Sequence, residues 1–213
     1  MKMKNYVITI AIGYGSGGSH IGRALSEKLG IPCYDTEIIQ MAADESGINE
    51  KFFFEANEKI NKGKLAVMTS KGVYSDMLYP PSDKKFLSNE NLFNYQAKVI
   101  RRLAVAGKES CIIIGKAANY ILKNFPNVVR VNIQAPMEYC VDNIQERLCK
   151  SAREAEEEIL EINRYRTDYY KYYTGGEWLD PAEYDISINT EAAGEDYAAD
   201  MIVRYLKDKV MKS

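Results

Sequence analysis

The chain has 213 residues, of which 46% are hydrophobic, so it is long enough to bury a sizeable core as a single domain spanning 1–213. Charged residues make up 27% of the chain and nearly balance, which leaves a net charge of -2 at pH 7. This balance excludes the broad basic field that nucleic-acid binding requires, and we expect no nucleic-acid partner.

The cysteines and the N-terminus favour a reduced, cytoplasmic setting. None of the four cysteines forms a C-x-x-C pair, and with one histidine in the chain we predict no metal site built from protein side chains. The N-terminal MKMK precedes an apolar run of only seven residues, which ends in a glycine loop without an A-x-A site, so we interpret it as a strand. No run approaches the roughly 18–20 apolar residues of a membrane span, and we expect no membrane partner.

The first elements predict a β–α–β unit. Residues 6–12 are β-branched and almost wholly apolar, which is typical of a strand buried on both faces. After a glycine-rich turn, apolar residues recur every four positions from Ile21 and indicate a helix that Gly30 can end. A short strand over 32–34 then reaches Asp35, and the two strands of such a unit should be parallel.

The next part of the chain is mainly helical in its pattern. Helices are predicted over 36–46 and 49–60, and the sequence YPPSDKK at 79–85 indicates a loop. A clearer helix runs from a Ser88 N-cap to residue 106, and Gly107 follows as its stop. We interpret 36–87 as a helical insertion that could bind an acceptor molecule.

Strands and helices alternate through the rest of the chain. Three further apolar runs predict strands at 111–114, 128–133 and 186–188. A helix opens at Pro136, a long charged stretch covers 151–173, and an amphipathic helix over 196–210 closes the chain. This alternation predicts an α/β fold with a parallel sheet covered by helices on both faces.

In such folds, ligands bind beyond the carboxyl ends of the strands. The turns at Gly13–Gly18, Asp35 and Gly115–Lys116 each follow a predicted strand. We therefore expect these three turns to border one crevice.

The sequence GYGSGGSHIGRAL, which starts at Gly13, fits two nucleotide-binding patterns. Gly13, Gly15 and Gly18 match the dinucleotide fingerprint G-x-G-x-x-G, and Asp35 lies where a ribose-binding acid belongs. Gly13 and Gly18 also fit the phosphate loop G-x-x-x-x-G-K-[ST], but its lysine position holds Ser19. In both cases the glycines allow close backbone approach and the following helix offers unpaired N–H groups to phosphate. A glycine turn without a ligand is the third interpretation.

One more pattern could support the dinucleotide interpretation. Tyr205 and Lys209 form a Y-x-x-x-K pair of the kind that some dehydrogenases use. They stand on the terminal helix, far along the chain from any suitable strand end, so we attribute the pair to chance.

Nearly the whole chain resembles the cytidylate kinase-like family of P-loop nucleoside monophosphate kinase relatives. The resemblance rests on an ordered series of motifs: GSGG at 15–18, Y-D at 34–35, I-I-G-[RK]-x-A from 113, Y-Y-x-x-Y-T-G-x-x-W from 169, and Y-D-x-x-I-N-T from 184. It implies a three-layer P-loop NTPase fold with a five-stranded parallel sheet and a helical lid. It also implies transfer of the γ-phosphoryl group of ATP, with Mg²⁺, to a nucleoside monophosphate such as CMP or dCMP, or to a related small acceptor.

The resemblance assigns the donor phosphates to the loop. The implied cradle consists of backbone N–H groups and two hydroxyls, contributed by Gly13, Gly15, Ser16, Gly17, Gly18 and Ser19. The chain departs from the family at Ser19, where relatives carry a cation, and at His20, where they carry an acid. Loss of one such cation can cost several kcal/mol of barrier.

Two nearby residues could compensate for the missing cation. Arg23 lies one helical turn after Ser19 on the same face, and His20 stands near the helix start. His20 could contact phosphate or could simply cap the first helical turn at the surface, and both interpretations stay open.

The resemblance assigns the acceptor site to three residues, Asp35, Lys116 and Asp185. In relatives the acid at Asp35 contacts the acceptor nucleotide or organises water and Mg²⁺, and the acid at Asp185 helps to hold the acceptor ribose or a lid arginine. Lys116 stands where relatives place an arginine on the acceptor phosphate, and lysine keeps the charge but loses the bidentate fork. Asp35 could instead cap the helix that follows it. Lys116 could instead be exposed and idle.

The segment 147–180 resembles a lid whose arginines reach the transferring phosphate. Arg164 and Arg166 begin the matching motif and are the implied catalytic cations, together with Lys116. The aromatic residues Tyr172, Tyr173 and Trp178 are predicted to pack the lid hinge. The alternative to a kinase is a regulatory nucleotide-binding protein on the same fold with little or no catalysis. The sequence does not predict an oligomeric state.

Overall fold

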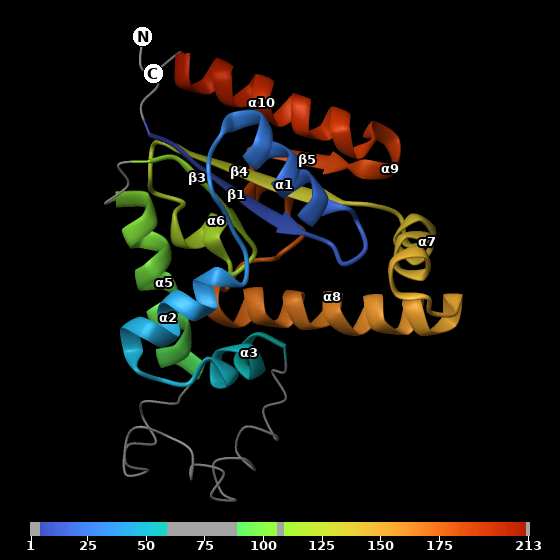
Figure 1. Ribbon diagram of the computed structural model, residues 1–213, viewed down its shortest axis with the longest axis horizontal. Helices are drawn as coiled ribbons and strands as arrows, with labels where there is room; N and C mark the ends of the chain where they lie inside the picture. Colours follow the sequence, from blue (N-terminus) through green and yellow to red (C-terminus); the bar gives the residue numbers. More distant parts are fainter. Residues whose placement is uncertain (1–4, 59–88, 106–108, 212–213) are drawn as a thin grey trace, which may run out of the picture.

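The β-branched run Val7–Ile12 forms strand β1 at the centre of a five-stranded sheet (Figure 1). The computed structural model describes residues 5–58, 89–105 and 109–211. The strand order is β2-β3-β1-β4-β5 and every neighbouring pair is parallel. The other strands are β2 (Cys33–Tyr34), β3 (Cys111–Ile114), β4 (Val128–Gln134) and β5 (Ile186–Asn189).

Helices cover both faces of the sheet, as predicted. On one face, α1 (Gly18–Leu29) and α10 (Glu195–Met211) pack on the sheet through a core that includes Ile10, Leu25 and Leu206. On the other face, α5 (Asn89–Val105) and α6 (Ala118–Ile121) pack on the sheet, and α2 (Glu37–Ser46) and α3 (Glu50–Glu58) pack on α5. The fully apolar strands thus have two buried faces, which explains why their sequence does not alternate.

Two further helices, α7 (Met137–Leu148) and α8 (Ala152–Thr174), lie beyond the carboxyl ends of the strands. α7 packs on the first half of α8 through a small apolar cluster that includes Ile144 and Ile159. The second half of α8 packs through Tyr169 and Tyr170 into a cluster that includes Ala11 of β1. Figure 1 shows α8 running across the view between the strands above it and α3 below it.

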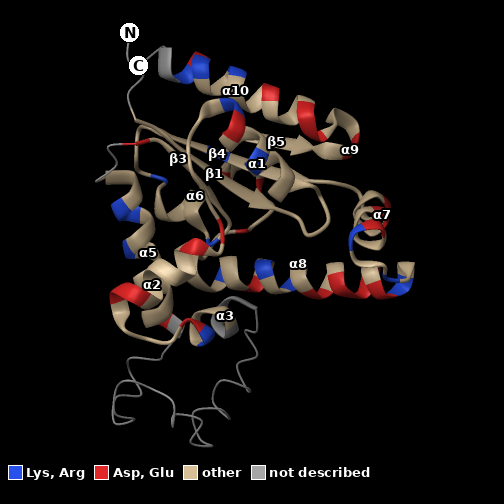
Figure 2. Cartoon of the chain, in the orientation of Figure 1, with Lys and Arg blue, Asp and Glu red and all other residues tan. Residues whose placement is uncertain are grey.

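Local sequence explains where α8 begins and ends. Ser151 accepts a hydrogen bond from the Glu154 backbone and Glu154 caps in return, which forms a capping box. Gly175 ends the helix with a left-handed φ of 71°. Its first half carries mostly charged residues (Figure 2), as expected for a helix with few buried positions.

Most predicted elements are confirmed, and their boundaries agree to within one residue inside the described ranges. The sequence did not predict the short elements α6, η1 (Pro181–Glu183) and α9 (Thr190–Ala193). The predicted end of the helix at 59–60, the loop at 79–85, the Ser88 cap and the Gly107 stop all lie outside the described residues. Within the described ranges, no helix is long and apolar enough to cross a membrane.

Candidate functional site

The loop between β1 and α1 has a backbone that only glycine adopts easily. Gly15 and Gly17 have φ angles of 85° and 78°. A Cβ atom on Gly15 would also lie 2.8 Å from the Cβ atom and the carbonyl oxygen of Cys140 on α7. The loop therefore needs glycine at this point both for its conformation and for its close contact with α7.

Internal hydrogen bonds hold the loop from behind. The Ser16 hydroxyl donates to the carbonyl oxygen of Gly13 at 2.8 Å, and Thr190 donates to the carbonyl oxygen of Ser16 at 2.7 Å. Ser16 is fully buried, so its hydroxyl does not face the cavity. The structure thus gives the Ser16 side chain a role in shaping the loop and does not place it as the phosphate donor that the sequence predicted.

The front of the loop presents unpaired donors. The amide N–H groups of Gly15, Gly17, Gly18 and Ser19 have no hydrogen-bond acceptor within the part of the chain that the structure describes. They stand at the N-terminus of α1, where the helix dipole is positive. Such an arrangement can hold an anion, such as a phosphate group, by its backbone alone.

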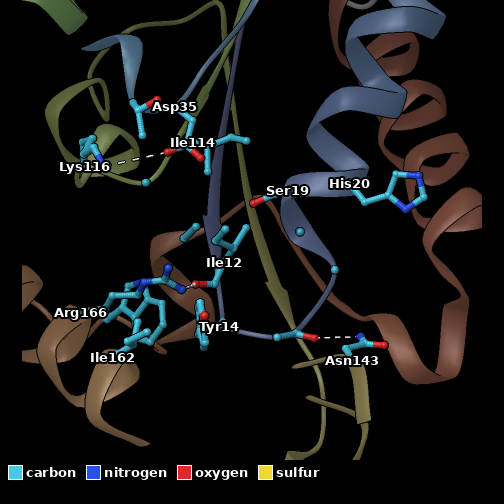
Figure 3. Close-up of a pocket in the computed structure, with 18 of the residues that line it drawn as sticks. Ile12, Tyr14, Ser19, His20, Asp35, Ile114, Lys116, Asn143, Ile162 and Arg166 are labelled. Carbon is cyan, nitrogen blue, oxygen red and sulfur yellow. Dashed lines mark hydrogen bonds and ion pairs between the residues drawn. The ribbon is translucent and has the colours of Figure 1, made fainter. Parts of the chain in front are cut away.

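The loop borders a cavity of about 1480 Å³, and the three strand-end turns meet there as predicted. Asp35 and Lys116 line the cavity, and the Lys116 ammonium lies 4.0 Å from the Asp35 carboxylate (Figure 3). The side chain of Lys116 is only 16% exposed and its φ is 55°. Lys116 is therefore not an idle surface lysine.

Asp35 does not cap the helix that follows it. Thr36 holds the N-cap position of α2, and the Asp35 backbone N–H donates to the carboxylate of Glu37. The Asp35 side chain is 43% exposed and faces the cavity. Its carboxylate is thus available to a ligand or to a hydrated cation.

Arg166 reaches the end of β1 from α8. Its guanidinium donates to the carbonyl oxygen of Ile12 at 2.7 Å and lies 5.8 Å from the centre of the Tyr14 ring. Burial lowers the pKa of Arg166, and the nearby carboxylate of Asp35 opposes that shift. Arginine stays charged in proteins despite such a shift, so a cation stands beside the loop. Arg164 is exposed and also lines the cavity.

Helices α7 and α8 are fastened to the loop by further contacts that the sequence did not predict. Asn143 on α7 donates to the carbonyl oxygen of Gly15 at 2.9 Å, and Asn163 on α8 accepts from the Tyr14 backbone N–H at 2.9 Å. The Tyr14 hydroxyl donates to Glu158 at 3.3 Å. Asn163 is the first residue of the segment NRYR, which belongs to the family resemblance, so the sequence did mark Asn163 as a candidate site residue.

The two residues that could compensate for the missing cation, His20 and Arg23, both stand on α1 at the border of the cavity. Nδ1 of His20 pairs with Glu195 at the start of α10, on the side of α1 away from Lys116 and Arg166 (Figure 3). Arg23 is exposed on α1 and lines the cavity. His20 has a carboxylate partner on another helix and also lines the cavity, so both of its interpretations stay predictions.

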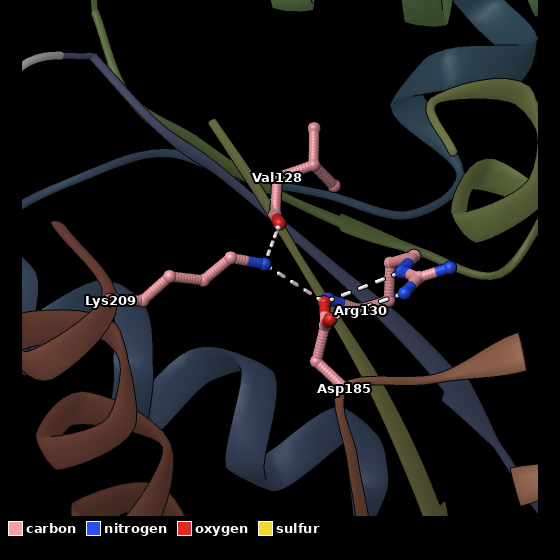
Figure 4. Close-up of polar contacts among 4 residues, drawn as sticks. All are labelled: Val128, Arg130, Asp185 and Lys209. Carbon is pink, nitrogen blue, oxygen red and sulfur yellow. Dashed lines mark hydrogen bonds and ion pairs between the residues drawn. The ribbon is translucent and has the colours of Figure 1, made fainter. Parts of the chain in front are cut away.

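Asp185 lies away from the cavity. Its carboxylate accepts from Arg130 at 3.1 Å and 3.3 Å and from Lys209 at 3.2 Å, and Lys209 also donates to the Val128 carbonyl (Figure 4). Asp185 is not among the residues that line the cavity. We therefore do not retain it as an acceptor-binding residue. The Lys209 contacts also give the Y-x-x-x-K pair no part in the cavity.

The aromatic residues at and after the end of α8 make contacts with the body of the protein. Tyr173 stacks on Phe93 of α5 with ring centres 4.2 Å apart, and the Tyr172 hydroxyl pairs with Glu90. Trp178 is 5% exposed. These contacts tie the C-terminal half of α8 to α5, so this half of the lid segment is anchored to the body of the protein.

The cytidylate kinase-like family matches residues 7–192 of the chain. A solved structure of an uncharacterized protein from Eubacterium ventriosum is 23% identical, covers 95% of this chain and 99% of its own, and has a TM-score of 0.69. A sugar kinase from Janibacter sp. is 13% identical over 96% of this chain and 95% of its own, with a TM-score of 0.52. A gluconokinase from Sinorhizobium meliloti is 14% identical over 100% of this chain and 99% of its own, with a TM-score of 0.50. At these identities the likeness establishes the fold, which is the α/β fold of P-loop kinases. No curated protein matches the chain.

Proposed function

Because the chain belongs to the cytidylate kinase-like family, we propose that it transfers a phosphoryl group from ATP to a nucleoside monophosphate of the CMP or dCMP type, or to a related small acceptor. The observation that carries this proposal is the composition of one cavity. Unpaired loop amides lie on one side, and the Lys116–Asp35 pair lies on the other. In phosphoryl transfer the protein forms no covalent bond of its own and acts mainly by positioning the donor and the acceptor and by neutralising charge. A cavity that joins a donor cradle to an acceptor site meets this requirement.

ATP is the donor in this proposal, and Mg²⁺ enters with it as part of the substrate. The amides of Gly15, Gly17, Gly18 and Ser19 hold the β- and γ-phosphates, and the α1 dipole adds to the attraction. Asp35 faces the same cavity and can bind a water molecule of the hydrated ion.

The acceptor lies between Lys116 and the apolar wall that Ile39 and Phe54 contribute to the cavity. Lys116 neutralises the acceptor phosphate as a point charge and offers no fork, so selectivity among monophosphates is expected to be broad. Arg164 and Arg166 are the proposed cations that stabilise the transferring group.

One observation favours a second function, a nucleotide-binding regulator with little catalysis. Ser19 leaves the loop without the cation that tracks charge onto the transferring phosphoryl group. A protein of this kind binds ATP and turns over none of it.

The test is an assay of ADP formation with Mg²⁺, ATP and a panel of nucleoside monophosphates, with gluconate included as a sugar-acid acceptor. We expect turnover with at least one pyrimidine monophosphate. The matched variant Lys116→Met should raise the acceptor KM by at least about tenfold and leave ATP affinity unchanged, since it removes one charge-assisted contact to the acceptor. Tight ATP binding without turnover on any acceptor would favour the regulator. An unchanged acceptor KM in Lys116→Met would remove Lys116 from the acceptor site.

A further inference from the structure

The donor loop needs a positive charge that its own sequence does not contain. The lysine position of the phosphate-loop pattern is Ser19, and the next residue, His20, is engaged with Glu195. A backbone cradle can bind phosphate, but a cation is needed to follow the charge that develops on the transferring group.

Arg166 is the cation that the structure ties to this loop. Its hydrogen bond goes to Ile12, one residue before the first glycine, and its guanidinium lies over the Tyr14 ring, one residue after that glycine. The contact to Ile12 uses one of the five N–H donors of the guanidinium. The remaining donors have no hydrogen-bond acceptor among the described residues.

The protein's own contacts hold Arg166 in this position. On the same helix, Asn163 accepts from the Tyr14 backbone and Glu158 accepts from the Tyr14 hydroxyl. The neighbouring helix α7 adds the bond from Asn143 to the Gly15 carbonyl. Loop, α7 and α8 therefore form one connected unit, and the position of Arg166 is set by the same residues that shape the loop.

We propose that Arg166 replaces the missing loop cation as a fixed member of the donor phosphate site, and that it is not a lid residue that arrives on closure. This proposal rests on the proposed function in that it takes the loop as a triphosphate site. It names a residue for donor binding that can be tested without any phosphoryl transfer.

A cation introduced at residue 19 would serve the same phosphates as Arg166. Lysine at position 19 should therefore raise phosphate affinity little while Arg166 is present and much when Arg166 is absent. Two residues that act independently would give additive effects instead.

The experiment is calorimetric titration of the whole protein with inorganic tripolyphosphate, and with ATP in parallel. Arg166→Gln should weaken tripolyphosphate binding by at least about tenfold, as expected for the loss of a charge-assisted contact. Ser19→Lys alone should change it by less than about twofold, and Ser19→Lys in the Arg166→Gln background should recover at least about fivefold. Arg153→Gln, an exposed arginine on the same helix, is the matched control and should bind as the native protein does.

Arg166→Lys covers the case in which the glutamine variant does not fold, because it keeps the charge near Ile12. It should bind tripolyphosphate more weakly than the native protein and more tightly than Arg166→Gln. Native affinity in a folded Arg166→Gln variant would overturn the proposal, and so would equal effects of Ser19→Lys in both backgrounds. None of these readouts depends on an acceptor, so a failure of the kinase assay leaves them unaffected.

Discussion

At the scale of single residues, Gly15 carries the sharpest constraint in the loop. An alanine there must adopt a φ of 85° and bring its Cβ atom to 2.8 Å from Cys140, including the backbone oxygen of that residue. A backbone atom cannot give way as the end of a flexible side chain can. Both the conformation and the contact therefore act against substitution.

Gly15→Ala should destabilise the fold by about 1–2 kcal/mol from the left-handed backbone and by about 1–3 kcal/mol more from the collision. Gly30→Ala is the matched control, because Gly30 also has a positive φ, of 64°, but has no atom within 4 Å of an added Cβ. Urea unfolding of the two variants measures the difference. Equal losses in both variants would show that α7 yields to the new methyl group.

At the scale of elements, α8 depends on a local signal at its start. The capping box of Ser151 and Glu154 satisfies two backbone N–H groups at the beginning of a 23-residue helix. Ser151→Ala should lower the melting temperature by about 2–4 °C, since it removes one cap from a protein of this size. Because this end of α8 is far along the helix from Arg166, tripolyphosphate affinity should stay unchanged. A loss of affinity would mean that the position of Arg166 depends on the whole helix.

The elements themselves were predictable because their signals are local. Apolar runs, the glycines at 13–18 and the stop at Gly30 each specify a strand, a turn or a helix end within a few residues. The contacts that complete the site are not local. Asn163 and Tyr14 are 149 residues apart in the chain, and no periodicity indicates that they meet.

The same contrast explains the individual site residues. Asp35 and Lys116 follow strands, and the rule that parallel strands end at one edge brings them to one cavity. Asp185 precedes a strand, and the same rule puts it at the opposite edge, where Arg130 and Lys209 hold it. The Ser16 hydroxyl lies in the right loop but points inward, which sequence spacing alone does not reveal.

At the scale of the whole molecule, the Asp185 cluster joins three parts of the fold. The Asp185 carboxylate precedes β5, Arg130 stands on β4 and Lys209 stands on α10. Burial raises the pKa of Asp185, but the hydrogen bonds from the Arg130 side chain and backbone and the charge of Lys209 outweigh burial, so the net pKa lies below its ordinary value of 3.8. A carboxylate of this kind stabilises the fold above its ordinary pKa and loses that effect as the pH falls toward its lowered value.

Asp185→Asn should therefore destabilise the protein by about 1–3 kcal/mol at pH 7, because it leaves two partly buried cations without a charged partner. The difference in stability between the variant and the native protein should become smaller as the pH falls below about 4, where the native carboxylate takes up a proton. Urea unfolding between pH 7 and pH 3 measures this difference in the free energy of unfolding, with Asp200→Asn as the control. Asp200 pairs with Lys28 in a solvent-exposed contact, so its loss should matter little at any pH. A gap for Asp185→Asn that stays constant down to pH 3 would show that the cluster acts through packing and hydrogen bonds and not through the charge of its carboxylate.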